Sequence, residues 1–138
     1  MDATPEALLP IAIFIASSLA ALVLHEAAHI AMARISGVRV KRIGISWRGP
    51  YIVREPGEPK ANIRIALAGP VMNVVVGMLF WDAAPTFAQI NLVLGLSNLL
   101  PISGSDGSHV WAALRQLKTA PSVAVPFRAA SQLDKRPI

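Results

Sequence analysis

The chain has 138 residues, one domain's worth, of which 54% are hydrophobic and 15% charged. With a mean hydropathy of +0.51, this composition indicates a membrane protein rather than a soluble globule. The formal net charge is +5, but Lys and Arg gather between and after the apolar segments, which is typical of membrane topology and not of nucleic-acid binding. The absence of cysteine excludes disulfides and thiolate metal sites, so any metal must be bound by His, Asp or Glu.

The first apolar segment runs almost unbroken from Leu8 to Leu24 and continues to Ile35. About 20 residues cross a bilayer core at ~1.5 Å per residue, so we expect a transmembrane helix over residues 8–35, closed by Gly37. No Lys or Arg precedes the segment, and a cleaved signal peptide is therefore not expected.

Near the end of this segment lies an H-E-x-x-H motif, His25-Glu26-Ala27-Ala28-His29. Residues four apart share one face of a helix, so the two imidazoles can bind one metal ion. Glu26 is the next residue along the helix after His25. It is near enough to act as a base on a metal-bound water molecule without being a ligand itself. Ionisable groups are costly inside a bilayer and usually have a function there. The alternative is that the two histidines only form hydrogen bonds with other helices.

Residues 38–60 separate the first and second apolar segments. Residues 38–47 alternate partly between apolar and polar, with a break at Lys41-Arg42, and Arg48-Gly49-Pro50 has the composition of a turn. Residues 51–53 form a second short strand candidate. We expect a β-hairpin, followed by a link rich in Pro and Gly that ends at Pro59.

Residues 63–81 predict a second transmembrane helix. Gly69, Asn73 and Gly77 recur every four residues and form a narrow face on which another helix can pack closely. Residues 86–102 predict a third, short transmembrane helix. Its Asn91, Gly95 and Asn98 fall on one polar stripe.

Pro101 is expected to end the third helix, and residues 103–107 to form a loop before a short amphipathic helix at 109–117. Asp106 in this loop is either an ordinary helix N-cap or a third metal ligand at the depth of the histidines. His109 is a surface residue or a competing ligand. Residues 119–138 are expected to form a loosely ordered cytoplasmic tail after a membrane-embedded core at 1–118.

Basic residues also predict the orientation. Residues 38–60 hold six Lys and Arg, and the region after Ile102 holds five, whereas the first seven residues hold none. Because basic loops stay in the cytoplasm, the N-terminus is expected outside and the C-terminus inside, in the inner or plasma membrane of the cell. The fold class is an α-helical membrane protein with three transmembrane helices and a β-hairpin between the first two.

Three motifs, in this order, resemble the site-2 protease family of intramembrane zinc metalloproteases. They are His25–His29, the run Ala68-Gly-Pro-Val-Met-Asn73, and Asn98-Leu-Leu-Pro101 leading to Asp106-Gly107. The resemblance covers about residues 8–110 and is close to the family's minimal core. The chain departs from the family in Ser103-Gly104-Ser105, where more proline and a Leu before Asp-Gly are common, and in Ser108, where a second Gly often follows.

The resemblance implies that His25, His29 and Asp106 bind Zn²⁺ and that Glu26 activates the catalytic water. It implies that Asn73 lies beside the site, where it stabilises the oxyanion or holds the substrate. The alternative for Asn73 and Asn98 is that their side chains only form hydrogen bonds between helices. The hairpin would present a β edge to an unwound substrate.

The expected function is peptide-bond hydrolysis in single-span membrane proteins near the cytoplasmic face, with a transmembrane substrate and the lipid bilayer as partners and no nucleic acid. The sequence does not predict an oligomeric state. The alternative is an inactive relative that binds metal or a partner helix. The altered serine-rich loop favours this alternative, and the intact Glu26 argues against it.

Overall fold

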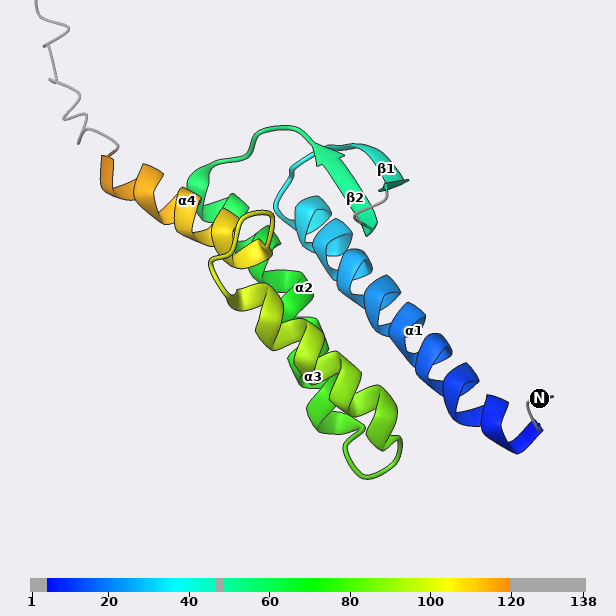
Figure 1. Ribbon diagram of the computed structural model, residues 1–138. Coiled ribbons are helices and arrows are strands. Elements are labelled where there is room, and N and C mark those ends of the chain that lie inside the picture. Colours follow the sequence, from blue (N-terminus) through cyan, green and yellow to red (C-terminus); the bar gives the residue numbers. More distant parts are fainter. Residues whose placement is uncertain (1–4, 47–48, 120–138) are drawn as a thin grey trace, which may run out of the picture.

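Figure 1 shows the computed structural model, which describes residues 5–46 and 49–119. Three longer helices lie side by side, the hairpin lies over one end of this group, and a fourth helix continues beyond the third. The elements are α1 (Pro5–Ile35), β1 (Val40–Ser46), β2 (Gly49–Arg54), α2 (Pro59–Leu79), α3 (Pro85–Leu99) and α4 (Asp106–Thr119). Apart from Thr119, the last residue of α4, the predicted tail lies outside the described residues.

Helix α1 confirms the first predicted apolar helix. It is 31 residues long, and its large apolar side chains are exposed along most of its length, from Leu8 to Val23 and again at Ile35. Such an exposed apolar surface is unfavourable in water and favourable in the hydrocarbon core of a bilayer. Within the described residues, Leu8–Ile35 of α1 and Pro59–Leu79 of α2 are the two helices long and apolar enough to cross a membrane.

Helix α2 begins four residues earlier than predicted, because Pro59 takes the first helical position, where its missing N–H costs nothing. The helix ends at Leu79, so Trp81 lies in the following turn and not in the helix. Helix α3 has 15 residues and ends at Leu99, three residues before the predicted boundary. Leu100 is extended, as expected of the residue before a proline. At ~1.5 Å per residue α3 is ~22 Å long, less than the ~30 Å bilayer core.

The face predicted on α2 is buried, and it packs against two different helices. A Cβ added at Gly69 would collide with the imidazoles of His25 and His29 on α1. One added at Gly77 would collide with Leu92 of α3, at 2.6 Å from its Cγ. Helix α2 is therefore the central element, in contact with α1, α3 and α4.

The hairpin is antiparallel, and its pairing is irregular between Val40 and Arg42, where the sequence alternation breaks. The turn predicted at Arg48-Gly49-Pro50 is wrong for its last two residues. Gly49 and Pro50 belong to β2 and pair with Ser46 and Ile45. Proline is tolerated at the beginning of such a strand, so the pairing extends past it; Trp47 and Arg48 lie outside the described residues.

Candidate metal centre

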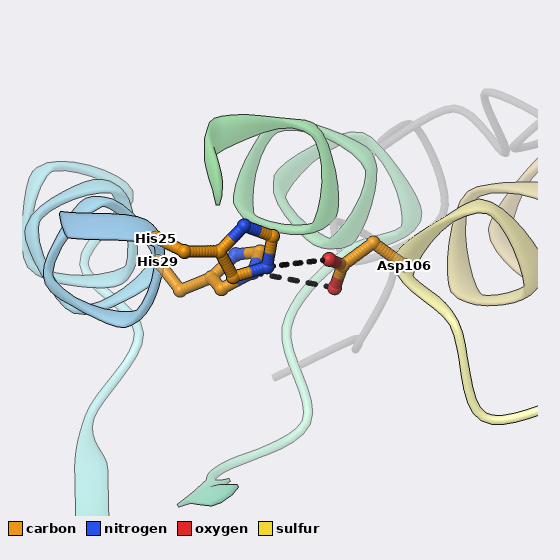
Figure 2. A group of neighbouring side chains, drawn as sticks. All are labelled: His25, His29 and Asp106. Carbon is orange, nitrogen blue, oxygen red and sulfur yellow. Dashed lines mark hydrogen bonds and ion pairs between the residues drawn. The ribbon is translucent and has the colours of Figure 1, made fainter. Parts of the chain in front are cut away.

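Three side chains converge where α1, α2 and α4 meet (Figure 2). His25 and His29 point from one face of α1 toward Asp106, the first residue of α4. Nε2 of His25 lies 3.0 Å from Oδ2 of Asp106, and Nε2 of His29 lies 3.3 Å from Oδ1. The two Nε2 atoms are 3.1 Å apart. The structure thus brings together the three residues predicted as metal ligands from positions up to 81 residues apart.

The other ring nitrogen of each histidine is held by an acceptor on α2. Nδ1 of His25 lies 3.1 Å from the side-chain oxygen of Asn73, and Nδ1 of His29 lies 2.6 Å from the carbonyl oxygen of Ile65. Because both partners are acceptors, each Nδ1 must donate its proton. Each Nε2 then presents a lone pair to the centre, the tautomer found in metal-bound histidines.

The donor set fits zinc. Ligand atoms 2.0–2.1 Å from a tetrahedral zinc lie ~3.3 Å from one another. Here the two Nε2 atoms are 3.1 Å apart, one carboxylate oxygen of Asp106 lies 3.0 Å from His25, and the other lies 3.3 Å from His29. Two lone pairs and a carboxylate directed at each other repel unless a cation or a proton lies between them. Three protein ligands also leave a fourth tetrahedral position open, as catalytic zinc sites do.

Asp106 is not the N-cap of α4, because its neighbour Ser105 takes that role. The Ser105 hydroxyl accepts a hydrogen bond from the backbone N–H of Ser108 at 3.2 Å, which is the contact that an N-cap makes. The Asp106 carboxylate is therefore free to contact His25 and His29. Gly107 lets this turn approach the end of α3, since a Cβ there would collide with the carbonyl groups of Leu99 and Leu100.

Asp106 is ionised at neutral pH. Burial alone would raise the pKa of its carboxyl group, but hydrogen bonds and positive charge from the imidazoles of His25 and His29, when a proton lies on Nε2, outweigh burial and lower the pKa to about 2. Its place in the first turn of α4 also favours a negative charge, because the helix dipole is positive there.

A cavity of about 510 Å³ opens onto this centre. Glu26 and the three candidate ligands line it together, and so does Asn98 of α3. Glu26 is partly buried and is not one of the residues whose ligand atoms converge. His109 also lines the cavity, but it is exposed and outside the ligand group, as expected of a surface residue.

Asn73 lies behind the histidines and does not line this cavity. It is fully buried, and its amide nitrogen donates to the carbonyl oxygen of Ala21 at 3.2 Å and to Oδ1 of Asn91 at 3.1 Å. Asn91 in turn donates to the carbonyl oxygen of Phe87. A polar chain therefore runs from α3 through Asn73 to His25.

Sequence reasoning missed three features of the site. The sequence predicts Asn91 only as part of a polar stripe and Ser105 only as a departure from the family's loop, and the backbone carbonyl of Ile65 carries no sequence signal. Of these, Ser105 could have been found, because a serine directly before the first helical residue is a common N-cap.

Comparison with known proteins agrees with this geometry. No family model matches the sequence. Rip3 of Mycobacterium tuberculosis, described as a zinc metalloprotease, is 34% identical over 131 residues, which cover 81% of this chain and 33% of Rip3. Zinc metalloprotease MJ0392 of Methanocaldococcus jannaschii is 27% identical over 110 residues, 70% of this chain and 32% of the relative. The chain thus spans about a third of the length of these curated relatives.

Among solved structures, the site-2 protease from Methanocaldococcus jannaschii has the same fold. The TM-score is 0.69 at 24% identity, over 78% of this chain and 56% of the other. The fold, the His-His-Asp centre and the relatives together define a homologue of zinc metalloproteases with apolar, membrane-type helices. The chain is thus similar to zinc metalloproteases in sequence and to a site-2 protease in fold. The resemblance noted in its motifs and the expectation of zinc are confirmed.

Proposed function

We propose that this protein is an intramembrane zinc metalloprotease that hydrolyses peptide bonds of single-span membrane proteins near the cytoplasmic face. The observation that carries the proposal is the cavity that Glu26 shares with His25, His29 and Asp106. A protein that only bound metal would have no need of a carboxylate there, which argues against an inactive, metal-binding relative.

Zinc held by the three ligands would lower the pKa of a water molecule at its open position and polarise the scissile carbonyl group. Glu26, as general base, takes the proton of the attacking water. It then gives this proton to the leaving amine as the C–N bond breaks. Glu26 can do both because its position, one residue from His25, leaves it in the cavity but outside the ligand group.

For the oxyanion we propose Asn98 in place of Asn73. The amide nitrogen of Asn73 already donates to Ala21 and Asn91, so both of its N–H groups are used. Asn98 lines the cavity and donates one N–H to the carbonyl oxygen of Leu94 at 3.0 Å. Its second N–H is available to a substrate oxygen. Asn73 then acts as a positioning residue for His25.

The hairpin is suited to hold an unwound substrate. Residues Pro50, Tyr51, Ile52 and Arg54 of β2 line the cavity, and within the described residues β2 pairs with β1 alone. An extended peptide that added to the other edge of β2 would lie beside the metal centre. This supports a substrate whose helix opens near the site.

For the topology, we propose that residues 1–118 form the membrane-embedded core and that α3 makes a third, short crossing. Helix α3 packs along α2 and α1 and exposes apolar side chains such as Val93 and Leu96, which supports a lipid-facing position. Thinning of the bilayer would accommodate its length. The basic residues favour a cytoplasmic hairpin and C-terminus and an outside N-terminus, in the inner or plasma membrane.

The test is Glu26→Gln in liposomes with a single-span substrate. We expect cleavage to fall by at least ~100-fold, the usual contribution of a general base, while the zinc content stays at the wild-type level. The zinc measurement shows that the variant is folded. Undiminished cleavage would contradict the role of Glu26, and an inactive wild type with bound zinc would favour the non-catalytic relative.

A further inference from the structure

Helix α4 presents an apolar and basic side that no described element covers. Gly107 is buried against the end of α3, and Ala113 is buried in a helix that packs mainly against α2. Trp111 is 52% exposed, and Leu114 and Leu117 are each 38% exposed. Positions 111, 114 and 118 lie close together on a helix, so Lys118 borders the exposed Trp111 and Leu114.

The cations on this side have no carboxylate partner within the part of the chain that the structure describes. The guanidinium of Arg115 lies over the ring of Trp111, 5.6 Å from its centroid. Arg115 and Lys118 are exposed, and none of the ion pairs among the described residues involves either of them. An aromatic ring, aliphatic side chains and long cations together are the composition of a membrane-interface helix.

Helix α2, which packs beside α4, also carries an exposed cation some distance from the metal centre. Gly69 of α2 and Asp106 of α4 both lie against the histidines, and α4 lies beside the beginning of α2 (Figure 1). Lys60 precedes Gly69 by nine residues and Arg115 follows Asp106 by nine, a rise of ~14 Å in each helix. Both side chains are exposed, so each of the two helices carries a basic group at the same distance along its own axis from the metal centre.

We propose that the exposed side of α4 binds anionic phospholipid headgroups, and that this contact holds Asp106 in the metal centre. Trp111 and Leu114 enter the boundary between headgroups and acyl chains, while Arg115 and Lys118 reach the phosphates. Because Asp106 is the first residue of the same helix, restricting α4 restricts the carboxylate that completes the ligand set. The lipid surface thereby regulates how firmly the protein holds its metal.

The test uses the full chain with Trp47→Phe and Trp81→Phe, so that Trp111 is the only tryptophan. It is reconstituted without substrate in vesicles that contain brominated phosphatidylglycerol or brominated phosphatidylcholine at equal fractions. We expect stronger quenching of Trp111 by the anionic lipid, and loss of this preference in Arg115→Gln/Lys118→Gln. The control Arg39→Gln/Lys41→Gln removes the same charge from the hairpin and should keep it.

Equal quenching by the two lipids, or a preference that survives the loss of Arg115 and Lys118, would overturn the proposal. So would the absence of quenching by either lipid, as expected if a protein partner covered α4. In a second measurement, zinc release to a chelator should be several-fold faster in vesicles of phosphatidylcholine alone than with phosphatidylglycerol. Equal release rates would contradict the link to Asp106. Neither the quenching nor the zinc release depends on proteolysis, so both measurements test this proposal independently of the proposed protease activity.

Discussion

The side-chain oxygen of Asn73 lies 3.1 Å from Nδ1 of His25, and both residues are buried between α1 and α2. This contact decides which nitrogen of His25 carries the proton. With Nδ1 committed to Asn73, the lone pair of Nε2 is directed at His29 and Asp106. An asparagine that sequence motifs place beside the site thus contacts a candidate ligand and does not line the cavity.

Replacing Asn73 should therefore weaken metal binding. Asn73→Leu removes the acceptor, and we expect zinc affinity to fall about 10–100-fold, the usual effect of losing such a partner. Asn73→Asp keeps an acceptor oxygen and should retain more of the affinity. Competition with a chromogenic chelator measures both variants. Unchanged affinity in the leucine variant would mean that Asn73 only joins the helices.

The two glycines on α2 offer a matched pair. A methyl group at Gly69 would lie 2.7 Å from Nε2 of His25, so Gly69→Ala should displace the imidazoles and lower zinc content. Gly77→Ala meets Leu92 and the carbonyl oxygen of Ala88 instead. It should lower thermal stability through poorer packing of α2 on α3 while zinc content is retained. Equal zinc loss in both variants would show that Gly69 acts through general packing.

Ser105 should matter through the start of α4. Its hydroxyl caps the helix whose first residue is Asp106, and loss of an N-cap costs about 1 kcal/mol. We expect Ser105→Ala to lower the unfolding free energy by that amount and to speed zinc release, with Ser105→Thr close to wild type. Thermal unfolding and chelator kinetics measure the two effects. A fully stable alanine variant would contradict the capping role.

Short sequence patterns were enough to predict α1 and the shared face of its two histidines. The spacing of His25 and His29 fixes their shared helix face, and the apolar run around them fixes α1. The place of Asp106 depends on how α2 and α3 pack, which a single sequence does not encode in any short window. The hydrogen-bond partner of Asn73 could not be predicted either. Only the packing of α2 against α1 places its side chain next to His25.

Two predicted boundaries failed, each for its own reason. Gly49 and Pro50 have turn composition, but pairing with β1 keeps them in the strand. The helix predicted at 109–117 begins three residues earlier, at Asp106, because Ser105 supplies the cap. The loop that departs from the family pattern is the segment that presents the third ligand.

Zinc content of the purified protein tests the central claim most directly, with wild type, Asp106→Ala and Glu26→Gln compared after dialysis against a weak chelator. The Asp106→Ala variant loses a ligand and should lose its zinc, whereas Glu26→Gln leaves the ligand set whole and should keep a stoichiometric amount. Wild-type zinc content in Asp106→Ala would contradict the His25–His29–Asp106 centre.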